Sequence, residues 1–219
     1  MATFAQLKAN LQAALNKGNA KTGANDTSIT ACIDRLVASS GTGPADPTEG
    51  LAYTLREGGL TYQCDGIGTA TGTELVIGGA YNGYPVTAIQ ESAFNNVQTY
   101  TKLTILDTIT SIPRLAFGST KATEVRLSCM LMSIGAWSFA YAPFTEVTIP
   151  PLVATVDSRA FTNCTALKKV TFKGIPTTII AEAFQGCTAL ADIYVPWAEG
   201  AVASAPWGAP DTVTIHYNS

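Results

Sequence analysis

Hydrophobic residues recur along most of this chain at intervals of 22 or 23 positions. In each interval a phenylalanine follows a small residue, an aliphatic residue usually stands five positions before it, and a short stretch of alternating apolar and polar residues comes after it. Several columns that agree on one period predict a repeat architecture, whereas a single column would be weak evidence. The phenylalanines are Phe94, Phe117, Phe139, Phe161 and Phe184.

The alternating stretches, such as Val147-Thr148-Ile149, predict one short β-strand in each repeat. A unit of this size cannot bury its apolar residues alone, so the units must stack and align equivalent residues in columns. We therefore predict a solenoid in which short parallel β-strands stack in about 5–6 coils. The phenylalanine column should fill its interior.

Both ends of a solenoid need caps, because an open end exposes core residues and a strand edge. Leu51–Leu55 and Leu60–Cys64 flank a glycine-containing turn, which predicts a β-hairpin N-cap. Towards the other end the period is lost, and Trp197 and Trp207 each follow a proline before a last alternating stretch at Thr212–Tyr217. We expect an irregular C-cap in which these tryptophans cover the core, and the alternative is an aromatic platform for a ligand.

Residues 1–42 do not follow the repeat and predict a helical hairpin. Two short helices with one apolar stripe each are too small to be stable alone. Their stripes must pack on each other or on the solenoid, or join other chains. The flexible linker predicted at 43–50, ahead of a repeat domain at 51–219, favours an anchor that joins other chains. The anchoring and oligomerisation residues are Phe4, Leu7, Leu11, Leu15, Ile29, Ile33 and Leu36.

Three segments carry a more specific pattern: SIGAWSFAYAPFTEVTIP, TVDSRAFTNCTALKKVTF and IIAEAFQGCTALADIYVP. They resemble the BspA-like leucine-rich repeat of bacterial surface antigens, whose usual unit reads I-x-x-x-A-F-x-x-C-x-x-L-x-x-V-x-I-P. The resemblance covers about 51–219, although Val97, Thr120 and Ala142 replace the cysteine in the first three coils. It implies a leucine-rich repeat solenoid. The two terminal segments also resemble structural proteins encoded by phages of gut bacteria.

Composition and motifs narrow the function classes. A net charge of -3 with 13 basic residues argues against nucleic-acid binding, which needs a basic face. A single histidine and the lack of P-loop, HExxH and GxSxG motifs argue against a catalytic site, a metal or a cofactor. There is no secretory signal pattern and no apolar run near the ~20 residues that span a bilayer, so we expect no membrane insertion.

The five cysteines lack the CxxC spacing of zinc sites. We expect reduced and mostly buried thiols, because a chain of this size does not need disulfides for stability. Cys164 and Cys187 fall in one column of adjacent coils, where a disulfide is geometrically conceivable and buried thiols are the favoured interpretation.

The candidate ligand surface is the outward face of the parallel sheet, because the residue between two inward ones must point out. A threonine ladder is also what β-propensity alone selects, so this face is either a binding surface or simply a solvated sheet. If it binds, Arg126 and Tyr194 should contribute most, while His216 is expected to be a surface histidine without a role. The face comprises a first column of Thr104, Arg126, Thr148, Thr171 and Tyr194, continued by Thr214 in the last strand, and a second column of Lys102, Glu124, Glu146, Lys169 and Asp192.

These observations predict a non-enzymatic structural and binding module. The favoured hypothesis is a phage virion appendage or decoration protein that is assembled in the host cytoplasm. Its N-terminal helices would join other virion proteins as a homo-oligomer, and its repeats would bind a host surface protein or glycan. The alternative is a bacterial cell-surface adhesin of the BspA-like type. Glu124 and Glu146 do not suggest a glycosidase, because exposed like charges on a flat sheet make no cleft.

Overall fold

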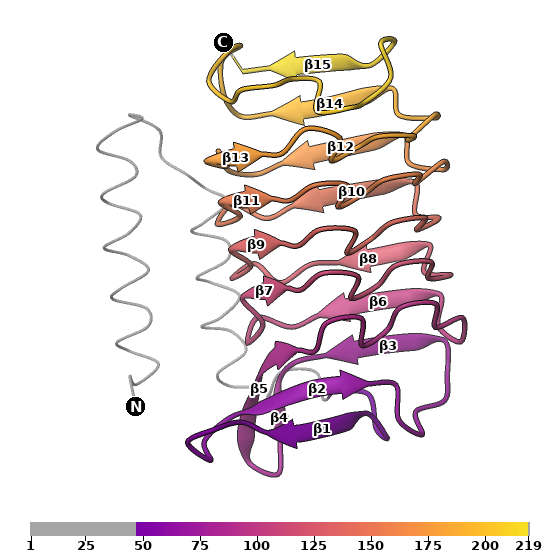
Figure 1. Cartoon of the computed structure of the whole chain (residues 1–219), viewed down its shortest axis with the longest axis vertical. Helices are drawn as coiled ribbons and strands as arrows, with labels where there is room; N and C mark the ends of the chain where they lie inside the picture. The colour runs from indigo at the N-terminus through magenta and orange to yellow at the C-terminus, as the bar shows by residue number, and fades with distance from the viewer. Residues whose placement is uncertain (1–46, 219) are drawn as a thin grey trace. The chain divides into compact units, whose positions relative to one another are not determined.

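The computed structural model describes residues 47–218, which form β-strands and turns without a helix. The strands wind into a parallel β-solenoid of about seven turns (Figure 1). The helical hairpin predicted at 1–42, with its anchoring residues, lies outside the described residues. Within the described part of the chain we find no helical segment with the length and hydropathy that crossing a bilayer requires.

One layer of the solenoid is the main parallel sheet, which contains one strand from each turn. Hydrogen bonds join its strands in two groups, and the ladder is interrupted between β8 and β10. The first group is β3 (Glu74–Ile77), β6 (Lys102–Ile105) and β8 (Glu124–Arg126). The second is β10 (Glu146–Ile149), β12 (Lys169–Phe172), β14 (Asp192–Val195) and β15 (Thr214–Tyr217).

A second parallel sheet of two-residue strands forms further along each coil. Its outward residues are serines and threonines, and its inward residues are Ile112 and the equivalents of that residue. The strands are β7 (Ser111–Ile112), β9 (Ser133–Ile134), β11 (Thr155–Val156) and β13 (Thr178–Ile179).

The N-cap is a four-stranded sheet in the order β1-β2-β5-β4. The predicted hairpin is present, with β1 antiparallel to β2. β5 then pairs parallel to β2 and leads into the first coil, while β4 folds back on it. The strands are β1 (Ala52–Leu55), β2 (Tyr62–Gly66), β4 (Ala80–Tyr81) and β5 (Tyr84–Ile89).

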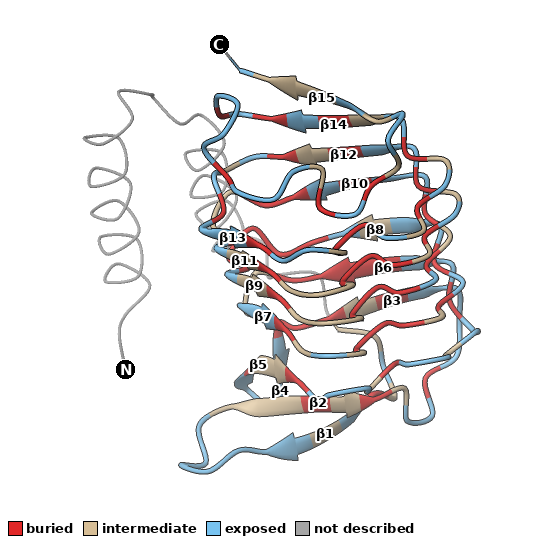
Figure 2. Cartoon of the chain, turned by 45° about the horizontal axis from the view of Figure 1, so that its top comes forward, coloured by how far each residue is buried: buried red, intermediate tan, exposed pale blue. Residues whose placement is uncertain are grey.

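The phenylalanine column runs through the interior as predicted. All five rings are fully buried, and successive centroids lie 5.4–5.5 Å apart with ring planes within 14° of parallel. Figure 2 shows the buried residues along the inner side of every coil. The predicted number of coils was too low. It was based on the phenylalanines, and the turns that contain β3 and β15 carry no phenylalanine of this column.

The two tryptophans of the C-cap cover the core. Trp197 and Trp207 are 3% and 1% exposed, and their rings lie edge to face at 6.4 Å. The Trp207 Nε1–H donates to the Ala203 carbonyl at 2.7 Å, so its polar atom is satisfied inside the cap. This burial confirms the expected lid and excludes the alternative of an exposed aromatic platform at these residues.

The four cysteines within residues 47–218 are buried, as expected, but not all are reduced. Cys64, Cys164 and Cys187 are free and buried. This confirms the prediction that Cys164 and Cys187, which share a column, are buried thiols and do not form a disulfide. Cys129 takes part in a disulfide, so the expectation of reduced thiols throughout was wrong for this residue. The spacing rules applied to the sequence consider local metal-binding and redox motifs and do not predict which cysteines form disulfides.

Candidate binding face

The main sheet presents most of its predicted outward residues to solvent. Arg126 and Thr148 are exposed, Thr171 is half-buried and Tyr194 is 41% exposed. Thr104 is only 7% exposed, so its assignment to the face was wrong. The strand register places it between Val76 and Arg126, two larger side chains that flank the short threonine from both neighbouring strands.

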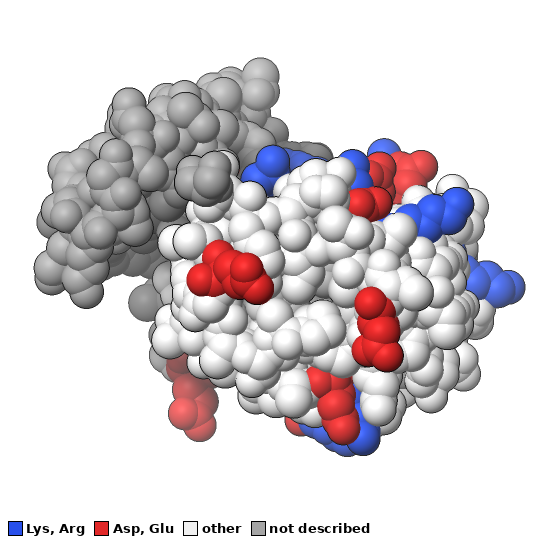
Figure 3. Space-filling model, turned by 90° about the horizontal axis from the view of Figure 1, so that it is seen from above, with Lys and Arg blue, Asp and Glu red and all other residues white. Residues whose placement is uncertain are grey.

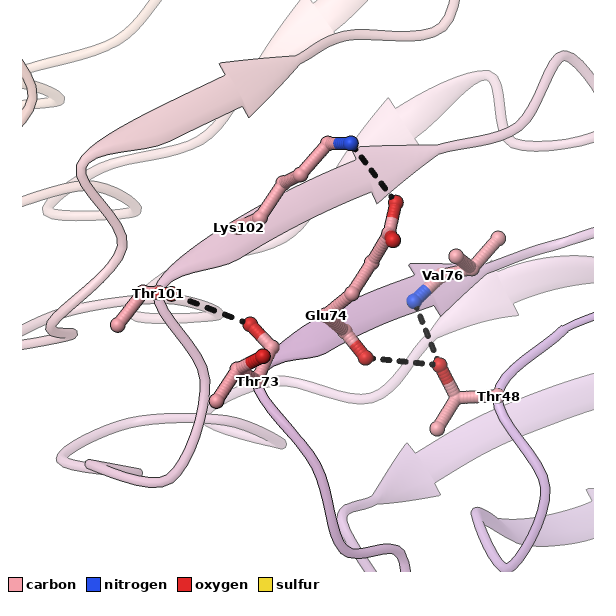
Figure 4. A network of polar contacts seen from close by, with 6 residues as sticks. All are labelled: Thr48, Thr73, Glu74, Val76, Thr101 and Lys102. Atoms are coloured by element: carbon pink, nitrogen blue, oxygen red, sulfur yellow. Dashed lines mark hydrogen bonds and ion pairs between the residues drawn. The ribbon is translucent and has the colours of Figure 1, made fainter.

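The second outward column is a ladder of charges at the first position of each strand. Lys102 Nζ lies 3.2 Å from Glu74 Oε1 (Figure 4), and Lys169 Nζ lies 3.1 Å from Glu146 Oε2. These side chains are about half exposed, so each pair contributes at most about 1 kcal/mol. The pairs neutralise charges that stacking brings close together. The part of the chain that the structure describes provides no ion-pair partner for Glu124.

The N-terminal edge of the main sheet is closed by Thr48. Its backbone N–H donates to the Val76 carbonyl at 2.9 Å, and its hydroxyl accepts from the Val76 N–H at 2.7 Å (Figure 4). Thr48 thereby satisfies polar groups of β3 that would otherwise form an open edge. At the other end β15 pairs with β14 and, within residues 47–218, has no strand on its far side.

A cluster of three side chains lies at this C-terminal end of the face. His216 Nε2 is 2.6 Å from Asp192 Oδ1, and the imidazole stacks on the Tyr194 ring at 4.2 Å with the planes 6° apart. The side chains of Asp192 and His216 are both 39% exposed. Two contacts therefore fix the orientation of a half-exposed imidazole, which is the preorganisation that a binding residue needs.

His216 was not predicted as part of this face. It follows Tyr194 by 22 residues, the repeat period, and the register pairs these two residues directly. The column assignment instead took Thr214 as the outward residue next to Tyr194, but Thr214 pairs with Asp192. Applying the period to the last coil would have found the cluster.

The face contains no visible catalytic or metal-binding constellation. Across residues 47–218 no group of three or more His, Cys, Asp and Glu side chains is placed to hold a metal ion. Glu124 and Glu146 belong to β8 and β10, between which the hydrogen-bonded ladder is interrupted, so they are not neighbours in one ladder. Seen from the C-terminal end, most of the described surface is neither acidic nor basic (Figure 3). The arrangement offers hydroxyls, a guanidinium and stacked rings for binding.

A stack of parallel strands with one aromatic column defines a solenoid of the leucine-rich repeat class. The family model described as "BspA type Leucine rich repeat region" matches residues 84–198 in 6 copies. The match covers more than half of the sequence, and the chain belongs to this family.

One solved structure shares the fold, and a second matches it with a lower score. The crystal structure of a leucine-rich repeat protein from T. pallidum is 19% identical, with a TM-score of 0.61 over 70% of this chain and 72% of that one. A leucine-rich repeat protein from Bacteroides ovatus is 22% identical, with a TM-score of 0.49 over 71% of this chain and 47% of that one. No curated protein matches this chain.

Proposed function

We propose that this chain is a non-enzymatic binding module that displays its solenoid on the surface of a phage particle. The observation that carries the proposal is the outward face of the main sheet. There Arg126, Thr148, Thr171 and Tyr194 stand on rigid strands, and His216 extends the same column. Arginine and aromatic residues supply most of the energy in protein interfaces, so the ligand is a host-surface protein or glycan.

Attachment to the particle is assigned to the segment at 1–42. Its apolar positions, from Phe4 to Leu36, would join other virion proteins and other copies of the chain. Many copies convert weak single contacts into strong attachment, because the later contacts of a bound particle form at high effective concentration. The resemblance of the terminal segments to phage structural proteins supports this placement.

The alternative function is that of a bacterial cell-surface adhesin. Family membership favours it, because BspA-like leucine-rich repeat proteins are often surface adhesins. Both functions use the same binding face. They differ in whether a phage particle or a bacterial cell surface displays that face.

Immunogold electron microscopy with antibodies against the full chain separates them. Gold on phage particles is the expected result, with preimmune serum as the control. Gold on the bacterial wall without labelled particles would support the adhesin, and unlabelled particles and cells would refute both placements.

The binding face is tested on the full chain with fluorescently labelled protein and intact host cells. Tyr194→Ala should lower cell binding at least tenfold. Tyr84→Ala is the matched control, because Tyr84 is 40% exposed but lies on the N-cap. Equal loss in both variants would show that the sheet face has no special role.

A further inference from the structure

The turns that contain the phenylalanine column have a left-handed backbone at two positions in every coil, two places before and two places after the phenylalanine. The residue two places after each phenylalanine has φ between +54° and +74°. Asparagine and glycine occupy such conformations more readily than bulky residues do. Four of the five positions carry small or short residues and the third carries a tyrosine: the set is Asn96, Ser119, Tyr141, Asn163 and Gly186.

Burial does not explain this tyrosine. Tyr141 is 54% exposed, the highest value among the exposed large hydrophobic residues of the described chain. Its backbone N–H donates to the Thr162 carbonyl at 2.9 Å, a bond that any residue at this position would make. Within residues 47–218 its ring has no aromatic, cationic or hydrogen-bonding partner.

Trp137, on the same turn, shows the contrast. It is also left-handed, with φ +59°, but the Arg159 guanidinium stacks over its ring at 5.2 Å. Arg159 Nε lies in turn 2.9 Å from Glu182 Oε2. The Trp137 side chain therefore makes contacts that stabilise the fold, and the Tyr141 side chain does not. Both residues nevertheless occupy a conformation that costs bulky side chains stability.

Short polar residues flank Tyr141 in its own column. The neighbours in the adjacent coils are Ser119, which is short, and Asn163, whose carboxamide leans towards the following coil. The space above Gly186 shows this, because a Cβ atom there would overlap Asn163 Oδ1. An exposed tyrosine ring that shares its column with a hydroxyl and an amide matches a sugar ring. The C–H groups of a sugar stack on π electrons while its hydroxyls exchange hydrogen bonds.

We propose that Tyr141 is the central contact of a glycan-binding site on this turn surface, flanked by Ser119 and Asn163. The site lies between β9 and β10, apart from the sheet face, and does not depend on the proposed function. The strained tyrosine is retained because its ring binds the ligand and not because it stabilises the fold.

The test combines binding and stability in the full chain. Wild-type protein is screened on a glycan array, and the affinity of the strongest hit is measured by calorimetry. Tyr141→Asn, which installs the residue found at 96 and 163, should weaken that affinity at least tenfold and leave the unfolding midpoint unchanged or higher. Tyr141→Phe should retain most of the affinity, because the stacking face remains.

Tyr84→Asn is the control, since it removes a tyrosine of similar size and exposure from the N-cap. Its affinity should stay within twofold of wild type. The proposal is overturned if the array shows no binding, if Tyr141→Asn binds as wild type does, or if Tyr141→Asn lowers the unfolding midpoint. A chain that binds no glycan but still binds cells through Tyr194 would overturn this site and leave the sheet-face function standing.

Discussion

Phe139 occupies the middle of the aromatic column, and its replacement by alanine tests how the solenoid is held together. Its ring is fully buried and stacks on Phe117 at 5.5 Å and on Phe161 at 5.4 Å. Phe144 adds an edge-to-face contact at 5.9 Å. Truncating a buried phenylalanine costs about 3–5 kcal/mol, because transfer energy is lost and a cavity remains. We expect Phe139→Ala to fall at the upper end of that range.

Phe94 is the internal reference, because it is equally buried but stacks on one ring, Phe117. The two further ring contacts of Phe139 contribute about 0.5–1.5 kcal/mol each beyond burial. Phe139→Ala should therefore cost about 1–3 kcal/mol more than Phe94→Ala.

Urea unfolding followed by circular dichroism measures both variants. The slope with denaturant should fall in Phe139→Ala, because a gap in the middle of a repeat stack lets its two halves unfold separately. An equal cost for Phe94→Ala, or a cost below about 1 kcal/mol for Phe139→Ala, would show that the column is not the main source of stability.

Three further predictions concern other parts of the described chain. DTNB at pH 8 should modify Cys64 and Cys164 only after unfolding, because both are buried and their pKa values are raised (that of Cys64 to about 12), which keeps the reactive thiolate scarce. Gly174→Ala should lower stability by about 1–3 kcal/mol in chemical denaturation, since its Cβ would overlap the Pro151 backbone. Asp192→Asn should change stability by at most about 1 kcal/mol in the same assay, because the contact between Asp192 and His216 joins two half-exposed side chains.

The central coils could be predicted from the sequence because a fixed period determines which residues stack. Once Phe139 and Phe161 are known to be one coil apart, the register of Val147 with Val170 follows, and the structure has that register. The end coils could not be counted in this way, because they carry no phenylalanine of this column. Leu75 of the first coil pairs in register with Leu103, and Trp207 of the last packs against Phe172.

Alternation along a strand predicted the direction of side chains but not their accessibility. Thr104 points out of the sheet like Thr148, yet it is buried and Thr148 is exposed. The difference depends on the side chains of neighbouring strands, which lie 22 or more residues away in the sequence. A single-strand pattern contains no information about them.

Departures from a column are more informative about binding than the column itself. Stacking explains why a buried position repeats phenylalanine, and β-propensity explains why an outward position repeats threonine. Neither explains a half-exposed histidine at the end of the threonine column, or an exposed tyrosine in a left-handed turn where the other coils place asparagine, serine or glycine. In a repeat protein each coil is a control for its neighbours, so His216 and Tyr141, together with Tyr194, are the residues for which we propose a role beyond folding.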